Sequence, residues 1–120
     1  MTLRKLLPAA VLAAALAATG AQAAELTFAL PIANGRVPAD KRLIRVKQGD
    51  VVKLQWSADK RTAIHLHGYD IEKTIEPGAT TEMSFTARIA GRFTVEPHVG
   101  RTSSGGHSHG TTLVTIEVRP

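Results

Sequence analysis

The sequence contains no cysteine. A chain without thiols forms no disulfide, so its hydrophobic core alone must hold the fold together. The same absence removes every thiolate ligand, and any metal site must use nitrogen and oxygen donors. Aromatic residues are also scarce, at 4% of the chain. Because the basic residues are scattered and aromatics are few, nucleic acid is a poor candidate partner.

Long apolar runs are missing, apart from one near the N-terminus. Arg4 and Lys5 precede an alanine-rich stretch, residues 6–18, which is too short to span a bilayer as a stable helix. The Ala-Gln-Ala at residues 21–23 has the small-x-small pattern of a cleavage site. This arrangement predicts a signal peptide over residues 1–23, export to the periplasm or the exterior, and no stable membrane anchor. An uncleaved anchor is the alternative.

Residues 24–120 are enough for one domain with a modest core. The formal charge of the whole chain is +5 at pH 7, and it falls to +3 when Arg4 and Lys5 are removed. A charge of this size, spread along the chain, indicates a solvated basic surface.

Apolar and polar residues alternate with a period of two through most of this domain. Such alternation gives each strand one apolar face and predicts half-buried antiparallel strands. Turn residues, such as Asn34-Gly35 and Pro77-Gly78, separate the strands. The spacing predicts an all-β sandwich of seven or eight strands with little helix. The alternating segments are residues 26–30, 44–46, 52–56, 83–85, 93–95 and 114–118.

The histidines fall into two groups, which are His65 with His67, and His98 with His107 and His109. Residues i and i+2 of a strand point to the same side, so the first pair shares one face. Ile64 and Leu66 share the opposite face, which is the natural core side. The second group lies in a segment rich in Gly, Ser and His, residues 97–110, which is predicted to be a long flexible loop.

Three stretches carry a resemblance to a known family. They read IRVKQGDVVKLQW at residues 44–56, HLHGYDI at residues 65–71 and EPGATTEMSFTARIAGRFTVE at residues 76–96. In this order they resemble cupredoxins, in particular exported cupredoxin-like proteins related to the cupredoxin domain of bacterial iron-uptake proteins. The resemblance covers roughly residues 43–118. It implies a Greek-key β-sandwich, and in members of the family that hold copper the metal lies between two loops at one end.

The resemblance does not extend to the blue-copper ligands. His65 or His67 matches the position of the first histidine ligand, but Pro97 falls where the cysteine ligand would be. Of the two methionines, Met1 leaves with the signal peptide and Met83 lies in mid-strand with its side chain inward. The Cu–thiolate bond that defines a blue-copper centre cannot form. The sequence therefore predicts neither such a centre nor the electron-carrier role that depends on it.

The histidines nevertheless favour a metal site of another kind. Imidazole binds Cu(II), Ni(II) and Zn(II), in an affinity order that peaks at copper. Glu96 and Asp70 offer additional oxygen donors. The prediction is an exported metal-binding or metal-handling protein without enzymatic activity, with a transition metal ion as its partner and a periplasmic protein as a further candidate partner. Its type 2-like copper site would draw on His65, His67, His98, His107 and His109.

Two alternatives remain open. Histidines can order loops through hydrogen bonds, which would make the chain a metal-free cupredoxin-like binding or structural module. The His-x-His spacing at His65 and His67 is also seen in copper-zinc superoxide dismutases, although that family uses a disulfide and a longer zinc loop. Other residues near the motif have simpler interpretations. Trp56 is predicted to lie in the core, Tyr69 to pack with its hydroxyl bonded, and Asp70 to cap a turn.

Overall fold

The computed structural model describes residues 2, 23–98 and 111–120. The predicted signal peptide therefore lies almost wholly outside the described residues, as do His107 and His109. In the described residues, no helix has the length and apolar character that crossing a membrane requires. The elements are β1 (Glu25–Ile32), the short 3₁₀ helix η1 (Ala39–Lys41), β2 (Leu43–Lys47), β3 (Val51–Ala58), β4 (Thr62–Leu66), β5 (Ile71–Ile75), β6 (Thr81–Thr86), β7 (Gly91–Pro97) and β8 (Val114–Arg119).

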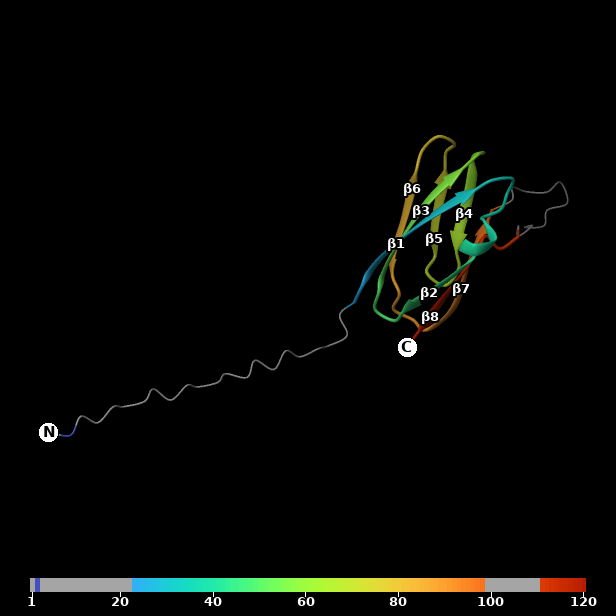
Figure 1. The fold of residues 1–120 in the computed structure, drawn as a ribbon. Helices are drawn as coiled ribbons and strands as arrows, with labels where there is room; N and C mark the ends of the chain where they lie inside the picture. The colour runs from blue at the N-terminus through green and yellow to red at the C-terminus, as the bar shows by residue number, and fades with distance from the viewer. Residues whose placement is uncertain (1, 3–22, 99–110) are drawn as a thin grey trace.

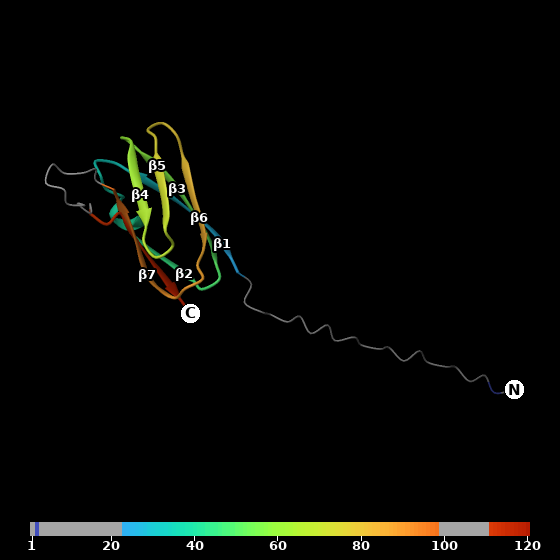
Figure 2. The ribbon, with the colours of Figure 1, turned by 180° about the vertical axis from the view of Figure 1, so that it is seen from behind.

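The eight strands form two sheets packed face to face (Figure 1, and from behind in Figure 2). One sheet has the order β1-β3-β6, and the other has the order β2-β8-β7-β4-β5. Most consecutive strands lie in different sheets, so the chain crosses repeatedly from one layer to the other. The prediction of an all-β sandwich of seven or eight strands is confirmed.

The prediction that the strands run antiparallel is wrong for two pairs. β1 runs parallel to β3, with Glu25 opposite Val51, and β2 runs parallel to β8, with Leu43 opposite Thr115. Period-two alternation reports which face of a strand is buried, and it is the same for either strand direction. Between β1 and β3 the chain forms β2 in the other sheet. When it comes back to the first sheet, β3 therefore runs in the same direction as β1.

The six alternating segments also leave out β4 and β5 as separate strands. β5 lies at the end of the strand order in its sheet and has two apolar residues, Ile71 and Ile75. The three residues between them are exposed. An edge strand with so little burial gives only a weak alternating pattern, because neither of its faces is fully covered.

The core lies between the two sheets and contains residues from every strand. Trp56 is fully buried in this core, as predicted, and Met83 is likewise fully buried. The indole N–H of Trp56 has no hydrogen-bond acceptor within the described part of the chain. Since the sequence has no cysteine, burial of these apolar side chains is the main source of stability. The largest fully buried side chains also include Leu30, Leu54, Ile64, Leu66, Ile75, Leu113 and Ile116.

A row of charged side chains crosses the outer face of β2, β8 and β7. Arg45 lies opposite Glu117, and Glu117 lies opposite Arg92. Glu117 Oε1 is 2.9 Å from Arg119 Nε, and its Oε2 is 3.2 Å from Arg92 Nη2. The hydrogen bond from Arg119 is the largest influence on the carboxyl group, and together with Arg92 it lowers the pKa of Glu117 against the opposing effect of desolvation.

This lowered pKa predicts a specific pH dependence of stability. A carboxyl group with a lower pKa in the folded state stabilises the protein above its unfolded pKa, and that contribution is lost as pH falls through the folded pKa. Glu117→Gln should remove the contribution at every pH. Thermal unfolding should therefore show a parent-minus-variant difference at neutral pH that shrinks in acid. A difference that stays constant down to strongly acidic pH would contradict this.

Candidate metal site

The histidine pair at the end of β4, with His65 in the strand and His67 just after it, points away from the core. Ile64 and Leu66 are fully buried between the sheets, whereas the side chains of His65 and His67 are 19% and 39% exposed on the outer face of the five-stranded sheet. The alternation along β4 therefore divides the strand as the sequence predicts, with aliphatic side chains inward and imidazoles outward.

The pairing of β4 with its two neighbours surrounds His65 with carboxylates. β4 lies between β5 and β7, and the register places Glu72 on one side of His65 and Glu96 on the other. The sequence indicates Glu96 and Asp70 as oxygen donors and leaves out Glu72. The position of Glu72 follows from the hairpin that joins β4 and β5. The register of that hairpin is centred on Gly68 and Tyr69, and it pairs His65 with Glu72.

His98 joins the pair from the end of β7. Its backbone N donates to Ala63 O at 2.8 Å, and the backbone N of His67 donates to Thr94 O at 3.0 Å. The ring centroid of His65 is 4.5 Å from that of His67 and 5.5 Å from that of His98. Three of the five predicted histidines therefore lie together on one face, with His65 in the middle.

Each of these rings faces a carboxylate of its own. The Nε2-to-oxygen distances are 3.2 Å for His67 and Glu96, 2.8 Å for His98 and Glu72, and 3.5 Å for His65 and Asp70. Thr112 Oγ1 also donates to the other oxygen of Glu96, at 3.4 Å. A neutral imidazole that donates from Nε2 keeps its lone pair on Nδ1, and a metal would bind through that atom.

A closely packed turn fixes the end of β4. The ring of Tyr69 packs on Phe85 and Phe93, with centroids 4.7 and 4.8 Å apart, and its hydroxyl accepts from Ile89 N at 3.4 Å. The prediction that Tyr69 is a packing residue with a bonded hydroxyl is confirmed. Gly68 has φ +88° and lies so close to Phe93 that an added Cβ would be 2.5 Å from Cδ1 of that ring.

Gly68→Ala is expected to destabilise the domain by about 1–3 kcal/mol from backbone strain alone, with the clash against Phe93 adding to it. Gly78→Ala is the matched control, because Gly78 has φ +82° but nothing within 4 Å of the added Cβ. Urea unfolding of both variants measures the difference. If Gly68→Ala costs no more than Gly78→Ala, the contact with Phe93 does not constrain the turn.

No protein-family model matches this sequence, and no curated protein matches it. Solved structures do resemble it. A chain of a heme-copper terminal oxidase dimer is 17% identical, over 80% of this chain and 65% of that one, with a TM-score of 0.62. A copper binding protein in the apo form is 12% identical, over 82% and 91%, with a TM-score of 0.61. The periplasmic domain of cytochrome oxidase subunit II from Bradyrhizobium japonicum is 17% identical, over 81% and 86%, with a TM-score of 0.57.

The chain has a cupredoxin-like fold. The expectation raised by the three sequence stretches is thus confirmed at the level of fold.

Within this cupredoxin-like fold, the inward positions near the histidines supply no metal ligands. Pro97, at the position that the resemblance gives to cysteine, lies opposite the fully buried Ile64, and Val95 is fully buried beside them. The histidines lie on the other side of the same strands. The residues present therefore do not fit a blue-copper centre.

The outer-face donors do fit a nitrogen and oxygen site in their chemistry. In residues 23–98 and 111–120, however, no group of three or more His, Asp or Glu side chains is already arranged to hold a metal. Each imidazole is turned toward its own carboxylate, so side chains would rotate to bring their donors together. An open hollow of about 280 Å³ adjoins Glu72 and His98 and leaves space for that movement.

Proposed function

We propose that this cupredoxin-like protein is exported and binds a transition metal, with Cu(II) preferred, through His65, His67 and His98. It acts in metal binding or handling rather than in catalysis. His107 and His109, outside the described residues, are further candidate ligands. The observation that carries the proposal is the group of three imidazoles on one sheet face, with neighbouring ring centroids 4.5 and 5.5 Å apart and a carboxylate beside each ring.

The chemistry of these donors favours copper. Affinities of nitrogen and oxygen sites for divalent metals rise to a maximum at Cu(II). Glu96 and Glu72 face Nε2 of His67 and His98, so each ring that donates from Nε2 would present the lone pair of Nδ1 to a metal. Without a thiolate the site would lack the bonding that tunes blue-copper centres for electron transfer. A role in holding and passing on copper is the function that such a donor set supports.

Two features support a location outside the cytoplasm. The N-terminal sequence has the basic start, apolar run and small-residue cleavage pattern of a secretory signal. One of the structures with the same fold is described as a periplasmic domain. A periplasmic protein that delivers or receives the metal is the corresponding partner.

Calorimetric titration of the purified exported protein with Cu(II), Ni(II) and Zn(II) tests the proposal. One Cu(II) site per chain, tighter than the sites for the other two metals, is expected. Absence of saturable binding by any of the three would leave the histidines with a structural role and support the metal-free module instead.

Glu96→Gln is expected to weaken Cu(II) binding by about 10–100-fold, the usual effect of losing a group that orients a metal-bound histidine. The glutamine keeps the size of the side chain but loses the charge that faces His67 Nε2. Glu82→Gln, on the exposed face of β6 in the other sheet, is the matched control. Equal affinities for the two variants would show that Glu96 does not support the site.

A further inference from the structure

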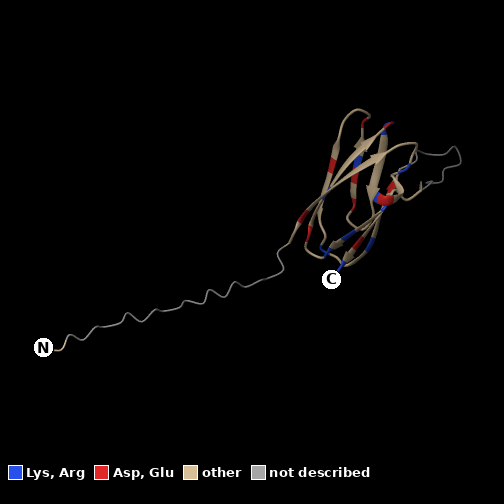
Figure 3. Cartoon of the chain, in the orientation of Figure 1, with Lys and Arg blue, Asp and Glu red and all other residues tan. Residues whose placement is uncertain are grey.

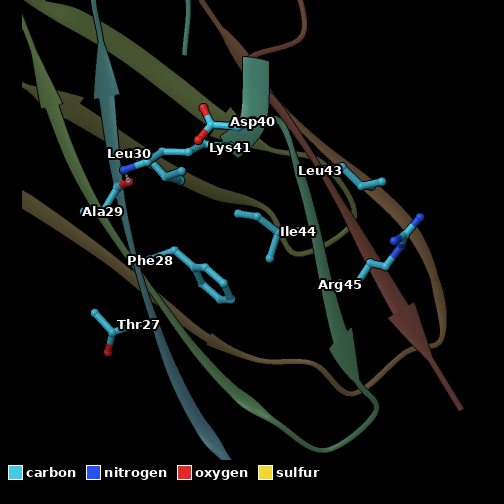
Figure 4. A pocket seen from close by; sticks show the side chains of 9 residues that line it. All are labelled: Thr27, Phe28, Ala29, Leu30, Asp40, Lys41, Leu43, Ile44 and Arg45. Carbon is cyan, nitrogen blue, oxygen red and sulfur yellow. Dashed lines mark hydrogen bonds between the residues drawn. The ribbon is translucent and has the colours of Figure 1, made fainter. Parts of the chain in front are cut away.

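A second candidate site lies along the open side of the sandwich, between β1 and β2. The strand orders place β1 at one edge of the three-stranded sheet and β2 at one edge of the five-stranded sheet. Figure 4 shows that these two edge strands border a hollow. This side of the sandwich is far from β4 in the strand order, so it is separate from the histidines.

Two adjoining hollows make up this region, which we call the seam groove. Arg45 lines both, so the two hollows are neighbours along β2. The first has a volume of about 310 Å³ and is lined by Thr27, Phe28, Ala29, Leu30, Asp40, Lys41, Leu43, Ile44 and Arg45 (Figure 4). The second has a volume of about 490 Å³ and is lined by Ala24, Leu26, Arg45, Val46, Lys47, Asp50 and Arg119.

The seam groove has an apolar floor. Phe28 and Ile44 point into the space between the two strands, while Leu43 and Arg45 lie on the outer side of β2 (Figure 4). Leu26 and Phe28 are only partly buried although they pack on the core, and Leu43 is 43% exposed. Apolar surface left open between two edge strands is a place where another segment can bury its own side chains.

The free edge of β2 also offers backbone hydrogen bonds. On the side of β8, Thr115 N donates to Arg42 O at 2.8 Å and Gln48 N donates to Arg119 O at 2.6 Å. In a parallel pair every second residue makes such bonds, so Leu43 and Arg45 direct their peptide groups to the opposite side, toward the seam groove. An extended peptide can add to an edge of this kind as a further strand.

The rim of the seam groove is positively charged. Lys41, Arg45, Lys47 and Arg119 line it, and Figure 3 shows basic residues gathered where β2 and β8 end. Its acidic residues are Asp40, which is exposed, and Asp50, which is buried and whose two oxygens accept the backbone N–H groups of Ala24 and Lys47. Arg45 and Arg119 also face Glu117 on β8, and the basic side chains still outnumber the acidic ones. A second copy of this chain would set the same basic rim against itself, so charge disfavours edge-to-edge pairing of two copies.

We infer that the seam groove binds an extended acidic segment of a partner protein, which adds to the edge of β2. Its apolar side chains pack on Leu26 and Phe28, and its carboxylates face Lys47. Charge complementarity selects this occupant and speeds its encounter. Because the histidines lie toward the other edge of the same sheet, the partner leaves them open.

Fluorescence anisotropy with the full exported protein tests the inference. The probe is a short labelled peptide of alternating glutamate and leucine, compared with the same peptide carrying lysine in place of glutamate. The acidic peptide should bind, more weakly as salt rises, and the lysine peptide should not. Lys47→Glu should weaken binding by about tenfold or more, because it places like charges together. Leu26→Ala should also weaken it, through loss of the apolar contact that the peptide makes with Leu26.

Lys73→Glu is the matched control, because the substitution changes the net charge by the same amount. Lys73 is exposed on β5, at the edge of the sheet opposite β2. This variant should leave binding unchanged within about twofold. If Lys47→Glu and Lys73→Glu weakened peptide binding equally, binding would depend only on the net charge of the protein, and the inference would be overturned. Equal binding of the two peptides, full binding by Leu26→Ala, or binding to anionic lipid vesicles without binding to the acidic peptide would also overturn it.

Discussion

His65→Ala should weaken Cu(II) binding by at least about 100-fold, because it removes a ligand outright, whereas losing an orienting partner costs about 10–100-fold. His65 has the largest expected effect among the described histidines, since its ring lies between those of His67 and His98. Its removal would separate the remaining two imidazoles. Calorimetry with Cu(II) at neutral pH measures the change.

Thr74→Ala is the control for this variant. Thr74 is exposed on β5 and lines the same hollow as Glu72 and His98, but it contributes no imidazole or carboxylate. It should bind copper as the parent does. If His65→Ala also retains the affinity of the parent, then the histidines order the sheet surface, and copper is not bound there.

Trp56→Ala should destabilise the domain by about 3–5 kcal/mol, as expected for truncating a fully buried aromatic residue. The free energy of unfolding of whole domains is commonly about 5–15 kcal/mol, so the substitution would remove a large part of it. The domain has no disulfide to restrict the unfolded chain, so nothing of that kind offsets the free-energy cost of the cavity. Urea unfolding followed by circular dichroism gives the difference, since the only Trp of the sequence is lost in the variant.

Trp56→Phe separates packing from hydrogen bonding. The indole N–H of Trp56 has no acceptor among the described residues, so phenylalanine forfeits no hydrogen bond and leaves only a smaller cavity. Its cost should therefore be well below that of alanine. Equal costs for the two variants, or a cost for alanine below about 1 kcal/mol, would contradict the tight packing of the buried Trp56.

The sequence predicts the parts of this fold that depend on local alternation. Ile64 and Leu66 are inward and His65 and His67 outward because successive residues of a strand face opposite sides. Strand direction does not follow in the same way. The parallel pairing of β1 with β3 is set by which sheet the intervening chain visits, and alternation has no bearing on that route.

The candidate site was predictable to a similar extent. The His-x-His spacing and the second group of histidines are visible in the sequence, and so is the missing thiolate. Which carboxylate meets which ring is not visible there, because the registers of two different strand pairs place Glu72 and Glu96 beside His65. Their oxygens then face His98 and His67. The seam groove could not be predicted from the sequence either, because it forms only where the edges of two sheets come together.

Electron paramagnetic resonance of the Cu(II)-loaded protein tests the central claim most directly. A site built from His65, His67 and His98 should give a tetragonal Cu(II) spectrum with nitrogen hyperfine structure, without the intense blue absorption of a thiolate-bound copper. Substituting His65 with alanine should alter or abolish that spectrum. A copper spectrum with no nitrogen coupling, or one that stays the same in His65→Ala, would contradict the account.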